Sequence, residues 1–155
     1  MTYTTATPEM AEEIQNVLHT TIRQIYPKYY PKEVVEFFCQ IHNREHILEN
    51  IASGNSGVLL EDKTIVGTGR FECNHIKGVY VLPRFQHKGY GSYILDCLEK
   101  EIAKLFPTAI LDASLPAVFF YEQRGYKTVG HGVCELENEV RLVYEIMEKN
   151  IWYKT

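Results

Sequence analysis

The segment from residue 76 to residue 106 limits what this chain can fold into more than any other part of the sequence. Residues 76–81 read as a strand that Pro83 ends, and two glycines, Gly89 and Gly91, come just before a long helix. The helix is predicted because apolar residues recur at helical intervals, at Ile94, Leu95, Leu98, Ile102, Leu105 and Phe106. Unpaired amides at such a helix start, together with the helix dipole, favour a bound phosphate group. A turn without a ligand would use the same two glycines.

The order of the predicted elements indicates the fold class. A first strand, helices that end near Tyr26, Ile41 and Ile51, and three consecutive strands precede the long helix. A strand over residues 109–113, a short helix over 117–124 and two strands over 126–135 and 140–148 follow it. Three consecutive strands without crossovers cannot all be parallel. We therefore expect a single α+β domain over residues 1–155, with a mixed, mostly antiparallel sheet flanked by helices.

The charge balance narrows the class of ligand. The 155 residues carry 16 Lys and Arg against 20 Asp and Glu, a net charge of −4, which argues against a nucleic-acid partner. Between positions 70 and 90, however, four basic residues accompany one acidic residue, namely Arg70, Lys77, Arg84, Lys88 and Glu72. Such a local excess of positive charge favours a small anionic ligand.

Several other classes of protein are disfavoured. The four cysteines, at positions 39, 73, 97 and 134, form no CxxC pair and have no suitably spaced histidine, so we expect no metal site. Apolar runs such as residues 117–120 are far shorter than the ~20 residues that cross a bilayer. The N-terminus has no signal-peptide pattern, so we expect a cytoplasmic protein without a membrane partner. A Rossmann dinucleotide site would require a glycine where Ile94 stands and a βαβ unit in place of antiparallel strands.

Two motifs resemble those of the GNAT superfamily of N-acetyltransferases. The first is similar to that family's acyl-CoA signature, a strand, a proline and then Gln/Arg-x-x-Gly-x-Gly/Ala, and reads here Val81-Leu82-Pro83 followed by Gln86-His87-Lys88-Gly89-Tyr90-Gly91. The second is similar to the family's Ala-x-x-Phe-Tyr-Glu-x-x-Gly-Phe and reads Ala117-Val118-Phe119-Phe120-Tyr121-Glu122-Gln123-Arg124-Gly125-Tyr126. The resemblance implies the GNAT fold over the whole chain. It also implies an enzyme that transfers acetyl from acetyl-CoA to a primary amine, by direct attack in a ternary complex.

The resemblance implies roles for particular residues. It places the coenzyme A pyrophosphate on the main-chain amides of Gln86, His87, Lys88, Gly89, Tyr90, Gly91 and Ser92. Pantetheine then pairs with the strand that ends at Tyr80 and Val81, where that strand splays from the next. A strand N–H at or near Val81 stabilises the oxyanion. Tyr121 stands where many members carry the phenol that protonates the departing thiolate.

The sequence departs from the family pattern at two places. Ser114 stands where many members carry an asparagine that helps to hold the cofactor, and capping the short helix is an equally good role for it. His75 stands where some members carry a catalytic glutamate, and an imidazole with a pKa near ~6.5 is able to take a proton from an ammonium group. A plain surface histidine is the alternative. Glu72 is the neighbouring candidate base, and Cys73 is a third.

Three questions stay open on the sequence alone. The family selects its acceptor with the first helices and their connector, here residues 26–38, where aromatic residues and carboxylates do not identify a particular amine. A sensor or interaction module of the same fold that binds acyl-CoA with little catalysis would keep both motifs, and a nucleotide-binding regulator would use the glycine turn for ATP or NAD. The residues Ile151, Trp152 and Tyr153 pack either internally or across an interface, so a monomer and a homodimer are both compatible with the sequence.

Overall fold

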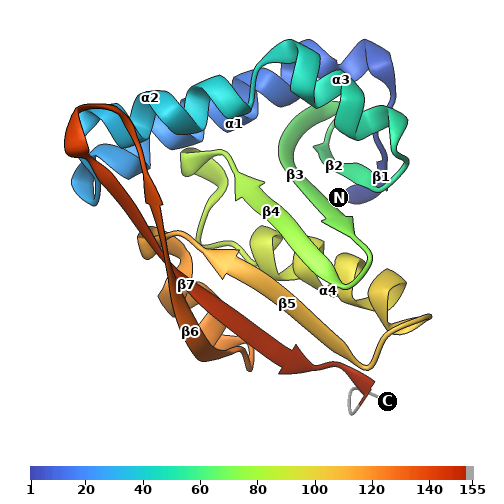
Figure 1. The fold of residues 1–155 in the computed structure, drawn as a ribbon. Helices are drawn as coiled ribbons and strands as arrows, with labels where there is room; N and C mark the ends of the chain where they lie inside the picture. The colour runs from blue at the N-terminus through green and yellow to red at the C-terminus, as the bar shows by residue number, and fades with distance from the viewer. Residues whose placement is uncertain (153–155) are drawn as a thin grey trace.

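The computed structural model of the chain describes residues 1–152 and contains one seven-stranded sheet in the order β1-β2-β3-β4-β5-β7-β6 (Figure 1). All neighbouring strands are antiparallel except β4 and β5, which are parallel. The strands are β1 Thr2–Thr5, β2 Ser56–Glu61, β3 Thr64–Glu72, β4 His75–Val81, β5 Thr108–Ala113, β6 Lys127–Glu135 and β7 Arg141–Asn150. The predicted α+β class, with a mixed and mostly antiparallel sheet, is confirmed.

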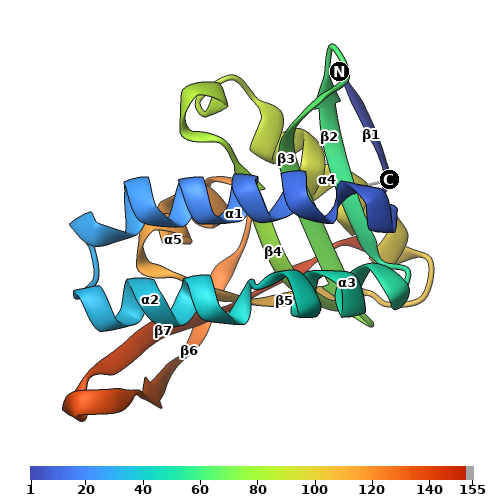
Figure 2. The ribbon, with the colours of Figure 1, turned by 90° about the horizontal axis from the view of Figure 1, so that it is seen from above.

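Helices cover both faces of this sheet. The helices before β2 lie across one face, and those after β4 lie across the other, as Figures 1 and 2 show. On the first face are α1 Ala11–Ile25, α2 Lys32–Ile41 and α3 Arg44–Ala52, and on the second are α4 Tyr90–Ala103 and α5 Val118–Gln123. The hairpin of β6 and β7 extends past α2 in Figure 2, and Figure 1 shows its tip at the level of the first helices.

The core is divided into two clusters by the sheet. One lies under α1 to α3 and includes Val17, Ile22 and Val34, which are almost fully buried. The other lies under α4 and α5 and includes Ile94 and Leu111. Buried residues recur in α1 every three or four positions because a helix of 3.6 residues per turn presents one face to the sheet. The apolar face of α1 and the predicted apolar face of α4 therefore each meet a face of the sheet.

Helix and strand ends follow from local chemistry, with one correction to the sequence-based expectation. The side chain of Asn43 caps α3 by accepting a hydrogen bond from the amide of His46 at 2.9 Å. The tripeptide Thr7-Pro8-Glu9 is typical of an α-helix start, with Thr7 as the N-cap and Pro8 in the first turn. Instead, the turn from Pro8 to Met10 is a 3-10 helix, the side chain of Thr7 makes no capping bond, and the α-helix begins at Ala11. Proline and the acidic residue in that first turn suit either kind of helix start, so the pattern did not distinguish them.

Strands β4 and β5 separate soon after they start. Only His75 and Ile76 of β4 pair with β5, at Ile110 and Leu111. Opposite β3 the register shifts at the same point, because Phe71 pairs with Ile76 while Arg70 pairs with Gly78, so Lys77 has no partner. A bulge of this kind bends a strand and increases its twist. The bulge at Lys77 therefore accompanies the divergence of β4 from β5, which we call the splay and which opens toward the arrowheads in Figure 1.

The bulge also decides which backbone groups of β4 face the splay. The amide of Leu82 donates to the carbonyl of Val66 on β3 at 2.9 Å. Because hydrogen-bonded residues alternate along an antiparallel strand, Tyr80 also directs its backbone groups to β3. The N–H and C=O groups of Val79 and Val81 consequently point toward the splay, where β5 has moved away.

The C-terminal segment was predicted to pack either internally or between subunits. Ile151 is buried, and the ring N–H of Trp152 donates to the carbonyl of Ala103 at 3.0 Å, so both contact this same chain. Tyr153 lies outside the described residues. Within residues 1–152, no helix has the length and apolar character needed to cross a membrane, and the four cysteines are free thiols.

Candidate functional site

Two cavities meet at the splay. The turn-side cavity, of about 360 Å³, lies between the end of β4, the loop before α4 and helix α5. The α2-side cavity, of about 620 Å³, lies between α2, β4, β5 and the hairpin of β6 and β7. Six residues line both cavities, namely Tyr26, Val79, Tyr80, Ser114, Ala117 and Tyr121. A molecule in one cavity therefore reaches the other through the splay.

The loop before α4 is shaped as an anion site. His87 and Gly89 both have left-handed backbone conformations, with φ of 62° and 85°. Together with the free amides at the start of α4, such a loop directs several N–H groups to one point. A Cβ at Gly91 would lie 3.0 Å from the ring of Phe120, so glycine keeps α5 close to this turn. The arrangement supports the predicted phosphate site.

Positive charge and one side-chain bond reinforce this turn. Arg84 and Lys88 lie over the ring of Phe85, at 5.1 and 5.6 Å from its centroid. The side-chain amide of Gln86 donates to the carbonyl of Val81 at 2.9 Å. The start of the turn is thereby tied to the end of β4, next to the splay.

Most of the residues predicted to bind the cofactor line the turn-side cavity. Those that do are Tyr80, Val81, Gln86, His87, Gly89, Gly91, Ser92 and Ser114. Lys88 and Tyr90 do not, and the hydroxyl of Tyr90 instead donates to Glu61 at 2.9 Å. In cofactor binding, Tyr90 is therefore limited to its main-chain amide, and Lys88 to its main-chain amide and its charge.

Arg124 is a residue of this cavity to which the sequence motifs assigned no role. Its guanidinium lies 3.9 Å from the centroid of the Phe120 ring and donates to the carbonyl of Phe120 at 3.0 Å and to the hydroxyl of Ser92. It thus places a positive charge beside the first turn of α4, where an anion is expected. The position of Arg124 inside the second motif was the only sequence feature that pointed to it. Its contact with Ser92 was not predictable from the sequence, because this contact depends on how α5 packs against α4.

A row of polar groups crosses the junction of the two cavities. The hydroxyl of Tyr26 lies 3.3 Å from the hydroxyl of Ser114 and 3.4 Å from that of Tyr80, and Tyr80 lies 3.5 Å from Nε2 of His42. These spacings are long for hydrogen bonds between hydroxyls. Ser114 stands at the N-cap of a short 3-10 turn but makes no side-chain capping bond. Its hydroxyl therefore serves the junction and not the helix end.

Tyr121 lies at the same junction on α5. Its side chain is buried, its ring packs edge-on against Phe120 and Tyr126, and it lines both cavities. Burial raises the pKa of its phenol above the usual value, with the nearby Tyr26 adding to the effect. The phenol therefore keeps its proton at neutral pH, as a general acid requires.

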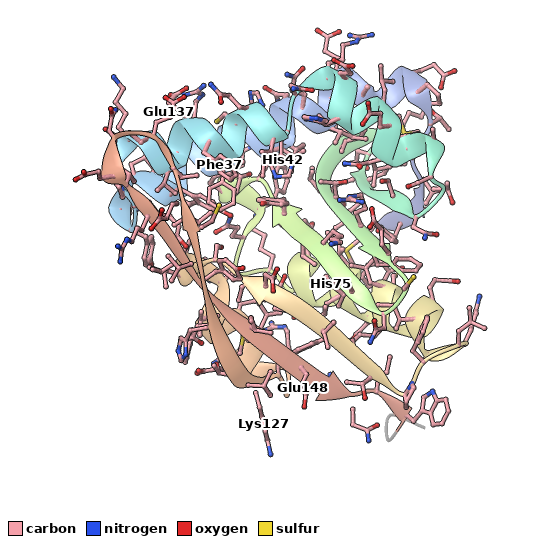
Figure 3. The ribbon with its side chains drawn as sticks, viewed as in Figure 1. Phe37, His42, His75, Lys127, Glu137 and Glu148 are labelled. Carbon is pink, nitrogen blue, oxygen red and sulfur yellow. The ribbon has the colours of Figure 1, made fainter. Side chains whose placement is uncertain are left out.

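The candidate bases His75 and Glu72 lie elsewhere. Figure 3 shows His75 at the far end of β4 from the splay, and neither residue lines either cavity. His75 approaches Asp112 at 3.9 Å, and burial lowers its pKa. Glu72 accepts a hydrogen bond from Arg70 at 2.6 Å, which lowers the pKa of Glu72. Cys73 forms part of the turn between β3 and β4, with φ of 52°. The structure thus brings Tyr121, Ser114 and the turn together, but not these three.

His42 is a second residue that the sequence did not single out. It follows α2, lines the α2-side cavity, and lies above β4 in Figure 3. Burial lowers its pKa to about 4, with the positive charge of Arg70 adding to the effect. His42 is therefore a neutral imidazole at neutral pH. Nothing in the sequence near His42 marks it, because its partner Tyr80 is 38 residues away.

A comparison with family models matches residues 25–144 to the family described as the acetyltransferase (GNAT) domain. Among the described residues, no group of three or more histidines, cysteines and carboxylates is placed to hold a metal ion. A search of the curated proteins finds no significant match.

Solved structures share the fold along almost the whole chain. A GCN5-related N-acetyltransferase from Rhodopseudomonas palustris has a TM-score of 0.89 at 22% identity, with 96% of this chain and 94% of that one covered. A PaiA N-acetyltransferase from Thermoplasma acidophilum, solved with coenzyme A, has a TM-score of 0.77 at 20% identity, with 96% and 98% covered. An aminoglycoside 6'-acetyltransferase type Ii has a TM-score of 0.69 at 20% identity, with 97% of each chain covered.

Proposed function

The chain belongs to the acetyltransferase (GNAT) domain family of N-acetyltransferases, and from this premise we propose that it moves acetyl from acetyl-CoA to a primary amine across the splay of β4 and β5. The observation that carries the proposal is the meeting of two cavities at Tyr121. One cavity lies below the turn of residues 86–92, which we call the anion-binding turn, and the other lies under α2. The proposal treats residues 1–155 as one catalytic domain, because strands from both ends of the chain join one sheet.

The turn-side cavity holds the donor in this proposal. The amides from Gln86 to Ser92 bind its pyrophosphate, with Arg124 adding charge beside the first turn of α4. The splay-facing backbone groups of Val79 and Val81 pair with the pantetheine amides, as an added strand does at a sheet edge, except the Val81 carbonyl, which already accepts a hydrogen bond from Gln86. This placement directs the thioester into the splay, beside Ser114 and Tyr121. The coenzyme A complex of the Thermoplasma acidophilum neighbour supports the same class of ligand here.

The transfer is a direct displacement at the thioester carbonyl. The neutral amine forms the C–N bond, the C–S bond breaks with its electron pair on sulfur, and Tyr121 gives its proton to that thiolate. The nitrogen loses one proton, so the products are an acetamide and coenzyme A. A backbone N–H of β4 that faces the splay, from Val79 or Val81, stabilises the oxyanion.

The base that takes the proton from nitrogen has two candidate positions. His75, expected from the sequence, lies away from both cavities and would act only through a chain of water molecules, and the same holds for Glu72. His42 lines the α2-side cavity and contacts Tyr80 at 3.5 Å, which supports His42 as the group nearer to the acceptor. A low pKa keeps its imidazole free to accept a proton at neutral pH, although it makes the imidazole a weak base.

Calorimetric titration tests the donor part of the proposal. Acetyl-CoA is expected to bind with a micromolar or lower Kd, with coenzyme A as a related ligand and with ATP and NADH as controls. Turnover with a panel of primary amines then separates an enzyme from a sensor module that binds acyl-CoA without catalysis. Absence of acetyl-CoA binding in a folded sample free of copurified ligand would overturn the proposal.

A further inference from the structure

Two of the four basic residues between positions 70 and 90 lie away from the anion-binding turn. Arg84 and Lys88 flank that turn, whereas Arg70 and Lys77 line the α2-side cavity. A donor bound in the turn-side cavity therefore does not contact Arg70 or Lys77. Their place in the second cavity points to the other substrate.

Both cations lie at the bulge in β4. Arg70 on β3 pairs with Gly78, and the adjacent Lys77 is the bulged residue without a partner. Both also line a smaller cavity of about 40 Å³ under α1 and α3, which continues from the α2-side cavity past His42. The charge of Arg70 contributes to the lowered pKa of His42, which agrees with a guanidinium close to the cavity wall.

The neighbouring carboxylates balance this charge only in part. Glu72 accepts from Nη1 of Arg70 at 2.6 Å, but its side chain is 52% exposed and lies outside the lining of the cavity. This contact uses one of the five N–H donors of the guanidinium. Asp112 is the one carboxylate among the described residues that line the cavity, and its side chain is 49% exposed beside His75. A free amine with further positive charges would therefore meet two cations and a single acidic group.

We propose, resting on the acetyl transfer argued above, that the acceptor is a primary amine that also carries a carboxylate, which Arg70 and Lys77 bind while the amine faces the splay. Guanidinium and ammonium groups form charge-assisted hydrogen bonds to carboxylates, which are stronger than those between neutral groups. The rings of Phe37 and Phe38 line the same cavity and cover the apolar part of such a molecule. Polyamines and other acceptors with several positive charges are disfavoured.

The spacing along β4 limits the length of the acceptor. Lys77 precedes Val79 by two residues and Val81 by four, so a rise of ~3.3 Å per residue places its backbone about 7–13 Å from the groups that face the splay. The long side chains of Arg70 and Lys77 shorten or lengthen this distance. A series of amino acids with a terminal amine and a terminal carboxylate, from glycine to 8-aminooctanoate, covers the range.

The test compares each amino acid of this series with the alkylamine of the same length, for example 6-aminohexanoate with hexylamine. For the best length, kcat/KM of the wild-type protein is expected to be at least about tenfold higher for the amino acid, through KM. In Arg70→Gln and Lys77→Gln this ratio falls toward one. In the exposed controls Arg141→Gln and Lys127→Gln it keeps the wild-type value, and melting curves check that every variant is folded.

Two kinetic outcomes overturn the inference without affecting the proposed function. One is transfer to alkylamines or to spermidine that equals or exceeds transfer to the amino acids, and the other is a ratio that neither cavity variant changes. A binding measurement decides the case in which no amine reacts: with coenzyme A present, N-acetyl-6-aminohexanoate should bind at least tenfold more tightly than N-hexylacetamide, and equal or absent binding of the two contradicts the inference. Failure of the proposed function is distinct, because then acetyl-CoA itself does not bind.

Discussion

The side-chain amide of Gln86 lies 2.9 Å from the carbonyl oxygen of Val81 and donates a hydrogen bond to it. The same carbonyl lies 3.4 Å from the hydroxyl of Thr21 on α1. Val81 directs its backbone groups toward the splay, so these two side chains cover one end of the open edge of β4. The contact from Gln86 therefore sets where the anion-binding turn starts relative to the strand that the donor is expected to extend.

Replacing Gln86 by Ala is expected to weaken acetyl-CoA binding without unfolding the protein. The change removes a hydrogen bond that contributes about 0.5–1.5 kcal/mol, which corresponds to a rise in Kd of about two- to tenfold. Calorimetric titration measures this rise. Gln40→Ala, at an exposed position of α2, is the matched control and should keep the wild-type Kd. Equal affinities for the two variants would contradict a role of Gln86 in the turn.

Replacing Tyr121 by Phe is expected to lower kcat by about 10² or more, the usual contribution of a positioned general acid. The ring stays in its buried place against Phe120 and Tyr126, so the acetyl-CoA Kd should change little. Steady-state kinetics combined with titration separates these two quantities. A wild-type kcat in Tyr121→Phe, with the chemical step shown by single-turnover kinetics to limit the rate, removes the phenol from the mechanism.

Replacing His42 by Gln tests the base. If His42 takes the proton from the amine, kcat/KM at neutral pH falls by about 10² or more, because that is the usual contribution of a positioned general base. His75→Gln is the matched variant at the position expected from the sequence and should then keep most of the activity. The opposite result, with loss only in His75→Gln, favours transfer through water to the far end of β4.

The lowered pKa of His42 also predicts how the stability of the protein depends on pH. Its pKa is about 4 in the folded protein against about 6.5 when unfolded, because burial disfavours the charged imidazole. The unfolded chain binds more protons between these values, so the free energy of unfolding decreases as the pH falls from 6.5 to 4, by about 3 kcal/mol in total. Urea unfolding at several pH values measures the slope. His42→Gln should lose this part of the slope, whereas the exposed His131→Gln should keep it.

Lys149→Met is expected to destabilise the protein strongly. Lys149 lies 3.3 Å from both carboxylate oxygens of Glu99, whose side chain is 1% exposed and accepts a further hydrogen bond from Tyr126 at 2.7 Å. Loss of the cation leaves a buried carboxylate without this compensation, which costs about 3–5 kcal/mol. Thermal or urea unfolding measures the loss. The double variant Lys149→Met/Glu99→Leu should recover part of it, and an equal loss in both would contradict the charge explanation.

Local patterns predicted much of the fold and part of the site. The helical spacing of Ile94, Leu98 and Ile102 placed α4, and the glycines before it placed the turn that precedes this helix, because helix periodicity and turn conformations depend on residues close in sequence. The motif around Tyr121 was visible for the same reason. The tripeptide Thr7-Pro8-Glu9 indicated a helix start but not its type, since an α-helix and a 3-10 turn accept the same first residues.

Contacts between distant residues were beyond such patterns. The junction joins Tyr26 to Ser114 across 88 residues and to Tyr80 across 54, and no spacing within one element indicates either pair. The bulge at Lys77 exists only relative to its partner strand. The same holds for His75. Counting back from Gly89 indicated which residue stands at the family's base position, but it did not indicate that the cavities open at the other end of β4.

The sequence by itself therefore determined the family, the sheet class and the glycine turn, and it predicted the role of Tyr121, since each depends on residues that are neighbours in the chain or on the order of elements. Only the tertiary structure decided that β4 leaves β5 after Ile76, that His42 faces the second cavity, and that Arg70 and Lys77 lie on the side away from the turn. The physical reason is that cavities, burial and charge environment arise where separate elements pack, and a local pattern does not contain the partner.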